Sequence, residues 1–282
     1  MESFIKADAV KFKYEKQEEK LILDNISLSI TPGEFVAILG HNGCGKSTLA
    51  KHFNALLSPS SGTIFIDGIN SCNEDKTYDI RKNVGLVLQN PDNQIVASIV
   101  EEDVAFGPEN LGIEPLEIRK RVDDTLKCVG MYEYKDHASY KLSGGQKQKI
   151  AIAGILAMHP KCIVLDEPTA MLDPLGRNEV IETIKKLNKE NKITVILITH
   201  FMEEAIMADR VIVMDQGKIL LDSTPKKVFS EVDLLKQHGI DVPQSVELLF
   251  KLKKSGLNLD IDALSLDQCV CALEKILEEK VK

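Results

Sequence analysis

The pattern of apolar and polar residues predicts strands and helices that alternate along most of the chain. Short apolar runs that end in polar residues are typical of buried parallel strands. Alternating segments bounded by turn residues favour strands with one exposed face. These signals predict strands over residues 4–14, 21–30, 35–39, 63–68, 84–88, 162–165, 193–198, 210–215 and 218–221, with a polar turn at 15–20.

Helical periodicity indicates a second set of elements. It predicts helices over residues 47–57, 177–189 and 201–208, and a mostly helical stretch over 99–131 that ends in a polar loop near 132–140. Glycine and proline predict breaks in that stretch at 107–108 and 112–115. Its second part has one apolar face opposite charged residues, made by Ile118, Val122, Leu126 and Val129.

From residue 225 the pattern changes to helices with polar joints. An apolar stripe of Leu266, Val270, Leu273 and Leu277 would pack on the chain's own core or contact a second subunit, and the pattern leaves both open. The order of elements predicts an α/β fold with a parallel sheet and an N-terminal antiparallel β subdomain. It also predicts an α-helical subdomain over about residues 91–160 and a small C-terminal helical domain over residues 223–282.

Composition narrows the class of protein. With 282 residues and 44% hydrophobic content, the chain can bury one large core and a small appendage. Its formal net charge of −8 argues against a general nucleic-acid binder, although it does not exclude a local basic patch.

The six cysteines form no zinc-type pairs, so reduced thiols are expected. Cys269 and Cys271 should point apart on a helix. The chain opens without a signal-peptide pattern, and no apolar run reaches the roughly 20 residues that span a bilayer, so any membrane role is expected to be peripheral.

One stretch carries the strongest chemical signal. It fits the phosphate-loop pattern and consists of Gly40, His41, Asn42, Gly43, Cys44, Gly45, Lys46, Ser47 and Thr48. Glycines let successive N–H groups point at phosphate oxygens, and the following helix adds the positive end of its dipole. Lys46 would place a charge at the β- and γ-phosphates, and the Ser47 hydroxyl could ligate Mg²⁺. The fold expected is therefore a P-loop NTPase core with ATP and Mg²⁺ as its cofactors.

Polar residues follow the ends of three further predicted strands. Asp166 is placed to hold the Mg²⁺ shell, and Glu167 to polarise a water against the γ-phosphate. Gln89 could reach Mg²⁺ or the attacking water, or could simply cap a strand edge. A lone histidine is usually structural, but His200 ends a parallel strand, and the carboxyl ends of such strands converge on the ligand crevice.

Two further signals have both a binding and a structural interpretation. Ser143 can cap a helix that begins there, while Gly144 and Gly145 leave N–H groups bare; this would be a second anion site or an ordinary helix cap. Tyr14, at the end of a strand, could stack on adenine or pack on the core.

The ordered set of motifs resembles the nucleotide-binding subunit of ATP-binding cassette (ABC) proteins over about residues 4–222. The set is the phosphate loop, Gln89, Leu-Ser-Gly-Gly-Gln at residues 142–146, Asp166-Glu167, Asp173 and His200. By this resemblance Tyr14 stacks on adenine, Gln89 senses Mg²⁺, Glu167 is the catalytic base and His200 holds the γ-phosphate. The resemblance also implies that Ser143, Gly144, Gly145 and Gln146 bind the γ-phosphate of a facing subunit, with Asp173 across that interface.

A narrower resemblance is to the ATPases of energy-coupling factor (ECF) importers, which take up vitamins and transition-metal ions. Residues 89–94, 106–110, 151–154, 170–174 and 239–246 carry it, and the first of the two paralogous ATPases is the more similar. It implies a C-terminal dimerisation domain and a second ABC ATPase subunit, self or paralogue, bound head to tail. It also implies a transmembrane coupling protein, a substrate-binding membrane subunit, no nucleic acid, and a peripheral place on the cytoplasmic face of the cell membrane.

Two other classes of function compete with this interpretation. A soluble ABC ATPase acting on nucleic acid or ribosomes is disfavoured by the acidic net charge and by the lack of a long coiled-coil insertion or a second nucleotide domain. A non-hydrolysing nucleotide switch is disfavoured by Glu167 and His200. Cys44 fills a position often occupied by serine in this family, and we expect its alkylation to block ATP binding and bound ATP to protect the thiol.

Overall fold

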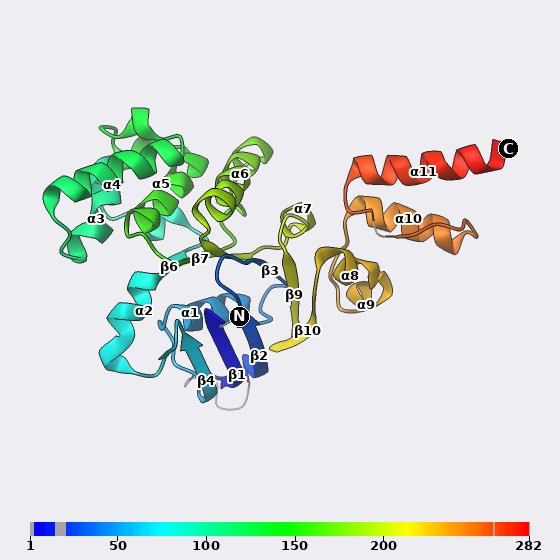
Figure 1. The fold of residues 1–282 in the computed structure, drawn as a ribbon, viewed down its shortest axis with the longest axis horizontal. Coiled ribbons are helices and arrows are strands. Elements are labelled where there is room, and N and C mark those ends of the chain that lie inside the picture. The colour runs from blue at the N-terminus through cyan, green and yellow to red at the C-terminus, as the bar shows by residue number, and fades with distance from the viewer. Residues whose placement is uncertain (1–2, 15–20, 262, 282) are drawn as a thin grey trace.

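Two β-sheets lie at the centre of the molecule in the computed structural model, which describes residues 3–14, 21–261 and 263–281 (Figure 1). Its strands are β1 (Ile5–Phe12), β2 (Leu23–Ile30), β3 (Phe35–Leu39), β4 (Ser61–Ile66), β5 (Ile69–Asn70), β6 (Val84–Val87), β7 (Cys162–Asp166), β8 (Thr194–Ile198), β9 (Arg210–Asp215) and β10 (Lys218–Ser223). The predicted turn at residues 15–20 lies outside the described residues. The α/β fold class is confirmed.

The larger sheet has the strand order β10–β9–β3–β8–β7–β6, and the smaller has the order β2–β1–β4–β5. In the larger sheet, strands β9 to β6 run parallel, and β10 pairs antiparallel with β9 as the predicted hairpin. The smaller sheet is antiparallel throughout. Asp67 and Gly68, both with positive φ, make the tight turn between β4 and β5.

The continuous apolar strands are buried on both faces. In β3, Phe35, Ala37 and Leu39 belong to one hydrophobic core, whereas Val36 and Ile38 belong to the other. Successive side chains of a strand point to opposite faces, so a strand between two cores must be apolar at every position. This is why these strands appear in the sequence as uninterrupted apolar runs.

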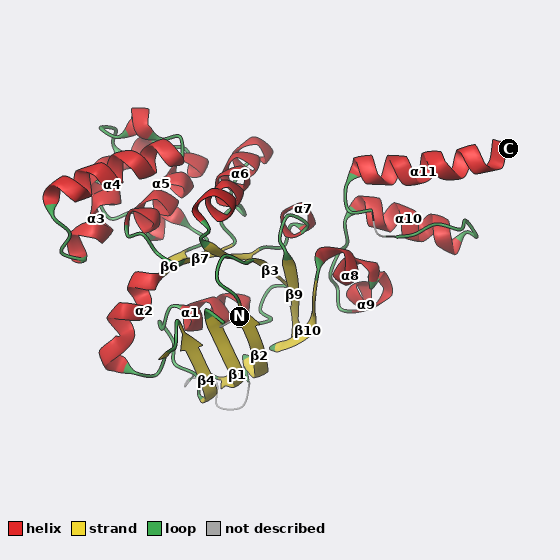
Figure 2. Ribbon diagram, in the orientation of Figure 1, coloured by secondary structure: helices red, strands yellow, loops and turns green. Residues whose placement is uncertain are grey.

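Helices cover the larger sheet on both faces (Figure 2). Helix α1 (Lys46–Phe53) contributes Leu49, Ala50 and Phe53 to the core between the two sheets. The other core takes side chains from α3 (Val100–Asn110), α4 (Pro115–Cys128), α5 (Gly144–Ala157) and α6 (Pro174–Asn191). Two shorter helices, α2 (Thr77–Asn83) and α7 (Met202–Ala205), connect strands. The predicted apolar face of α4 is buried, with Val122, Leu126 and Val129 at 2% exposure or less.

The helix break predicted at residues 107–108 is wrong, because α3 continues through Pro108 to Asn110. Pro108 lies in the last turn of the helix, so it forgoes one hydrogen bond, to the carbonyl oxygen of Val104, near the helix end. Gly107 is required by packing rather than by a turn: a Cβ there would lie 2.8 Å from Cγ of Met158 on α5. The break predicted at residues 112–115 is confirmed, since α4 begins at Pro115.

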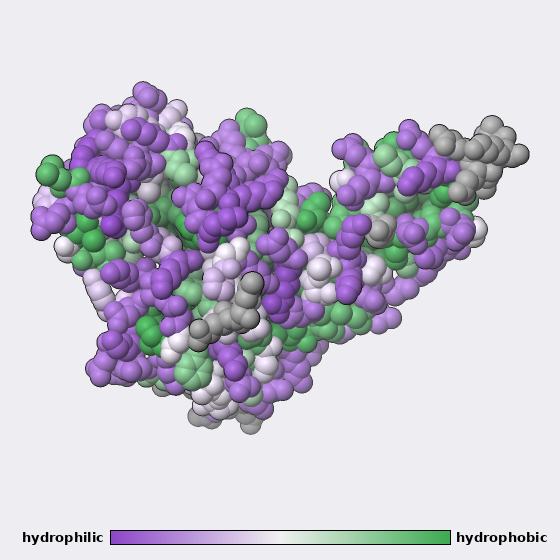
Figure 3. All heavy atoms as spheres, viewed as in Figure 1, coloured by the Kyte–Doolittle hydropathy of each residue, from purple (hydrophilic) through white to green (hydrophobic). Residues whose placement is uncertain are grey.

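Within the described residues, four helices follow β10. Helices α8 (Pro225–Ser230) and α9 (Val232–Gln237) add Val228, Phe229, Val232 and Leu235 to the larger core. Helices α10 (Gln244–Lys254) and α11 (Leu266–Val281) form an arm that projects from the body (Figure 3). Across the described ranges, no helix combines the length and apolarity needed to cross a bilayer.

The apolar stripe predicted on residues 266–277 only partly matches the face of α11 that packs in the arm. Leu266 is 75% exposed and Val270 is 45% exposed, whereas the arm's own small core takes Cys269, Ala272, Leu273 and Ile276 from α11. The side chain of Leu277 lies outside the described residues. Cys269 is buried and Cys271 is exposed, so the two thiols diverge, as expected for residues two positions apart on a helix, which lie about 200° apart around its axis.

Candidate active site

The phosphate loop joins β3 to α1 in a conformation that depends on glycine. Gly45 has φ +109°, and a Cβ at this position would lie 2.8 Å from the Ile22 carbonyl oxygen. Lys46 is 4% exposed, and its Nζ donates hydrogen bonds to the carbonyl oxygens of Gly40 (2.7 Å) and His41 (3.1 Å). The loop therefore curls around the ammonium group of its own lysine.

A carboxylate from β7 faces the start of α1. Asp166 is 8% exposed, and its Oδ1 accepts a hydrogen bond of 3.0 Å from the Ser47 hydroxyl. Burial raises the pKa of Asp166, the neighbouring Glu167 raises it further, and the Ser47 hydrogen bond opposes both effects. These two side chains place hard oxygen ligands next to the phosphate loop.

Glu167 is the centre of a cluster that joins three strand ends. Its Oε2 accepts a hydrogen bond of 3.1 Å from Nε2 of Gln89 and lies 3.6 Å from Nδ1 of His200. Its Oε1 lies 4.0 Å from Nζ of Lys46. Glu167 itself has φ +49°, a conformation that costs a non-glycine residue free energy and is concentrated at functional sites. The parallel sheet thus brings together the four residues that sequence analysis selected for catalysis.

A cavity of about 380 Å³ opens above the phosphate loop. Glu167 and Gln89 line one side of it, and Tyr14 lies at its rim with a 37% exposed ring. The Tyr14 hydroxyl lies 3.4 Å from Oγ1 of Thr48, and its ring packs edge-on against Phe12. The remaining lining residues are Ile22, Asn42, Gly43, Gly45, Lys46, Ser47 and Thr48.

Other predicted site residues lie outside this cavity. Ser143 caps α5 in a capping box: its hydroxyl accepts from the Gln146 amide, and the Gln146 side chain accepts from the Ser143 amide. Gly144 and Gly145 follow in the first turn, next to Leu172. Asp173 caps α6 by accepting from the amide of Gly176 at 3.2 Å. These residues form a separate surface whose N–H groups and side chains do not reach the chain's own phosphate loop cavity.

The side chains of Cys44 and His41 turn away from the cavity. Cys44 is 2% exposed within the core between the sheets, and burial raises the pKa of its thiol. A buried thiol with a raised pKa reacts slowly, so we expect Cys44 to resist alkylation in the folded protein; the predicted effect of its alkylation on ATP binding stays a prediction. His41 instead points its Nε2 at Asp215, 2.6 Å away.

Sequence analysis missed two polar clusters beside the site. Asp215, at the end of β9, accepts hydrogen bonds from His41 and, through its other oxygen, from Nδ1 of His238 at 2.6 Å. A carboxylate at the end of a buried strand is the same signal that identified Asp166, so Asp215 could have been found. The second cluster surrounds Glu204, which lies on the helix predicted at residues 201–208 but belongs to no motif.

Comparison with known proteins decides the family. The family model for ABC transporters matches residues 23–170. The energy-coupling factor transporter ATP-binding protein EcfA1 of Caldanaerobacter subterraneus subsp. tengcongensis is 61% identical over 272 residues, which cover 96% of this chain and 98% of the relative. The EcfA1 protein of Clostridium perfringens is 58% identical over 275 residues, with the same coverage. The chain belongs to the ATP-binding proteins of energy-coupling factor transporters.

Solved structures agree with this assignment. The structure of cbiO1 from Clostridium perfringens, described as part of the ABC transporter complex cbiONQ, has a TM-score of 0.77 and 38% identity, and covers 89% of this chain and all of its own. The ATP-binding cassette MJ0796, in a dimeric post-hydrolysis state bound to ADP and Pi, has a TM-score of 0.71 and 33% identity, over 78% of this chain and 98% of its own.

The family fixes the class of activity. This ECF ATP-binding subunit is an ATPase that energises transport, and it binds ATP. The relatives support this interpretation and not the alternative of an ABC ATPase that acts on nucleic acid or ribosomes.

Proposed function

We propose that the chain is one half of a head-to-tail ATPase pair, in which each ATP is held between the phosphate loop of one subunit and residues 143–146 of the other. The observation that supports this proposal is that the phosphate loop and the cap of α5 lie apart within one chain. The cavity holds the phosphate loop and Glu167, while Ser143 and Asp173 cap helices on a surface apart from it. Bare N–H groups at the start of α5 would bind a γ-phosphate brought by a facing subunit.

Mg²⁺ fits the residues at the phosphate loop. Ser47 and Asp166 would hold it, with Gln89 nearby, because hydroxyl, carboxylate and amide oxygens are the ligands that Mg²⁺ prefers. Among the described residues no group of three His, Cys, Asp or Glu side chains could hold a metal ion, which agrees with a site that takes its other ligands from phosphate and water. When bound, the ion would neutralise charge on the phosphate oxygens.

The roles of the chain's own groups follow from their positions. When ATP binds, Lys46 would break its hydrogen bonds to the Gly40 and His41 carbonyl oxygens and contact the β- and γ-phosphates instead. Its positive charge would then stabilise the phosphoryl group during transfer. Glu167, held by Gln89 and close to His200, would accept the proton of the attacking water. His200 would hold the γ-phosphate. Gln89 would contact the bound nucleotide or its Mg²⁺ and so change the position of the loop that follows β6.

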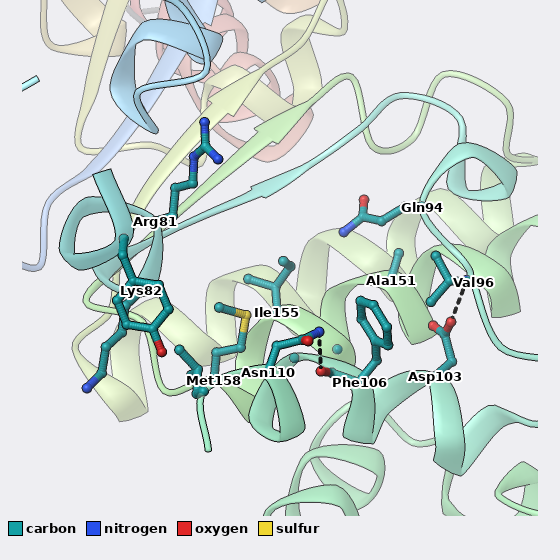
Figure 4. A pocket seen from close by; sticks show the side chains of 14 residues that line it. Arg81, Lys82, Gln94, Val96, Asp103, Phe106, Asn110, Ala151, Ile155 and Met158 are labelled. Carbon is teal, nitrogen blue, oxygen red and sulfur yellow. Dashed lines mark hydrogen bonds between the residues drawn. The ribbon is translucent and has the colours of Figure 1, made fainter. Parts of the chain in front are cut away.

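A groove beside that loop would receive the membrane partner (Figure 4). It has a volume of about 350 Å³ between α2, α3 and α5. Phe106 and Tyr78 line it and are half exposed, and Ile155 and Met158 add further apolar lining. Gln94 lines it and also fixes the loop, because its Oε1 accepts from the Leu88 amide at 3.1 Å. An amphipathic helix from a cytoplasmic loop of a transmembrane coupling protein is the occupant we propose.

The remaining assignments extend this proposal. The chain would sit at the cytoplasmic face of the membrane, with a separate membrane subunit selecting a vitamin or transition-metal ion as cargo. Domain boundaries would lie near residues 4–222 and 223–282, with the arm of α10 and α11 joining the two ATPases. Its exposed Leu266 and Val270 provide an apolar contact for that purpose.

The direct test replaces Glu167 with Gln in the tagged full-length chain, purified with its transporter from the membranes of its own cell. We expect turnover to fall by about 10²-fold or more while ATP binding is kept, because only the proton acceptor is lost. Glu182→Gln, at an exposed carboxylate on α6, is the matched control and should turn over like the wild type. Wild-type turnover in the Glu167 variant would remove Glu167 as the base.

A further inference from the structure

Glu204 on α7 is a buried carboxylate with no place in the mechanism above. It is 2% exposed, and its two oxygens accept hydrogen bonds of 2.6 Å from two threonines. Oε1 accepts from Oγ1 of Thr169, and Oε2 accepts from Oγ1 of Thr199. Burial raises the pKa of Glu204, and the hydrogen bonds from the two threonines oppose that effect.

The two threonines belong to different functional segments. Thr169 follows Glu167 and begins the turn that leads to Asp173, which we assign to the facing subunit's interface. Thr199 directly follows β8 and precedes His200, and its Oγ1 also accepts a hydrogen bond of 3.0 Å from the amide of Phe201. Glu204 therefore ties the backbone on either side of His200 to the segment that carries Asp173.

A second connection runs through Arg177, in the first part of α6. Its amide donates to the carbonyl oxygen of Asp173 at 2.9 Å, and its guanidinium stacks on the ring of Phe201 at 3.4 Å from the centroid. The Phe201 ring lies against that of His200, with centroids 4.1 Å apart. Arg177 thus links the Asp173 segment to the histidine from the opposite side.

The contact between Arg177 and Glu204 is incomplete. Nε of Arg177 is buried without a hydrogen-bond partner in the described part of the chain, and it lies 3.9 Å from Oε1 of Glu204. A buried donor without a partner is costly. Oε1 of Glu204 already accepts from Thr169 but has a second lone pair, so a small approach of Arg177 to Glu204 would satisfy the Nε–H.

We propose that Glu204 is a positioning residue that couples the 169–173 segment to His200. Docking of a facing subunit against Asp173 would move the start of α6, close the Arg177–Glu204 contact and fix His200 beside Glu167. This inference rests on the proposed roles of His200 and Asp173. Glu204 itself touches no reacting atom, so it acts only through the histidine.

The test uses conservative variants in the full-length chain purified with its transporter. Glu204→Gln keeps the side-chain size, Thr169→Val and Thr199→Val each remove one hydroxyl, and Thr125→Val is the control. Thr125 is a similarly buried threonine on α4, remote from the cluster. We expect kcat to fall about tenfold in Glu204→Gln, Thr169→Val and Thr199→Val. In Thr199→Val, the KM for ATP and the melting temperature should stay near those of the Thr125→Val control.

A double-mutant cycle separates positioning from simple stabilisation. In a His200→Ala background, Glu204→Gln should lower kcat no further, because a residue that acts through His200 has nothing left to position. The inference is overturned if the double variant loses kcat by the product of the two single losses. It is also overturned if Glu204→Gln, Thr169→Val and Thr199→Val all keep the kcat of the control. The proposed function fails separately: a His200→Ala chain with wild-type turnover would remove the role of His200 itself. If Glu204→Gln is unstable, the two threonine variants decide the question.

Discussion

Lys46 shows how the sequence of the phosphate loop determines the site at the level of single residues. Its charge is buried, yet it donates to two carbonyl oxygens of its own loop, so the ammonium is not left without hydrogen bonds. The loop can curl this tightly because Gly45 has no side chain to collide with β2. The motif therefore specified both the ligand chemistry and the local geometry.

Tyr14 gives a prediction for nucleotide affinity. Its ring is exposed at the cavity rim, so we expect Tyr14→Ala to weaken ATP binding by about tenfold, the scale of one base–aromatic stack. Tyr14→Phe keeps the ring and loses only the long contact with Thr48, so its dissociation constant, measured by calorimetry, should stay near the wild-type value. Equal affinity in the alanine variant would show that the ring only packs on Phe12.

The burial of Cys44 gives a prediction about the order in which the thiols react. Under native conditions a thiol reagent should modify the exposed Cys72 and Cys271 first and leave Cys44 unmodified, with or without ATP. Mass spectrometry of the digested protein measures this order directly, and the exposed thiols are internal controls. Rapid modification of Cys44 that ATP prevents would restore the original expectation.

The chemistry of single residues was more predictable than their surroundings. The residues at the ends of β3, β6, β7 and β8 were found from sequence because parallel strands place their carboxyl ends at one edge. Burial of the Cys44 side chain and the partner of His41 depend on tertiary packing, which no local pattern encodes. The bridge made by Glu204 joins residues that no motif groups together.

At the level of elements, helix α3 shows where sequence signals mislead. Its Gly-Pro pair is a reliable breaker in isolation, but in the structure Gly107 lets α3 approach α5 closely. The buried face of α11 differs from the predicted stripe because packing also depends on the neighbouring helix α10. The periodic pattern of apolar residues alone allows more than one buried face. Strand positions were predicted more closely, because burial on both faces leaves few alternatives.

Asp215 links β9, the phosphate loop and the end of α9, and this link has a pH dependence. Burial raises the pKa of Asp215, but hydrogen bonds from His238 and His41 outweigh it, so the pKa lies below its ordinary value. A carboxyl with a depressed pKa in the folded state stabilises the fold above its unfolded pKa, about 3.9, and this stabilisation is lost as pH falls through the folded pKa.

We therefore expect Asp215→Asn to lower the free energy of unfolding by about 1 kcal/mol, since both histidines are partly exposed to solvent. The difference from the wild type should be constant from about pH 6 down to about pH 4 and shrink below that. Urea unfolding at several pH values measures it. A difference that grows as pH falls would contradict the assigned cause.

The groove between α2, α3 and α5 gives a prediction for the membrane partner. Phe106→Ala should weaken binding of the transmembrane coupling protein by about tenfold or more while ATP affinity is unchanged, because a central aromatic anchor dominates such interfaces. Leu116→Ala is the control: Leu116 is an exposed apolar residue on α4, outside the groove. Equal loss in both variants, or in neither, would move the docking site elsewhere.

At the level of the whole molecule, the chain holds a phosphate loop and, outside the cavity above it, the helix start at residues 143–146. We propose that this helix start binds the nucleotide of a facing subunit, so that two subunits complete each other's sites. A pair that closes on ATP and opens after hydrolysis needs contacts that differ between ATP and its products. The coupling of that motion to a membrane protein is the central claim of our account.

The measurement that tests this claim most directly is the rate of ATP hydrolysis by the purified chain, alone and in complex with its membrane partners. We expect weak hydrolysis by the chain alone. The rate should rise by about tenfold when the membrane complex holds the two subunits in their productive geometry. Strong hydrolysis by the chain alone, unchanged when the membrane complex is added, would contradict it.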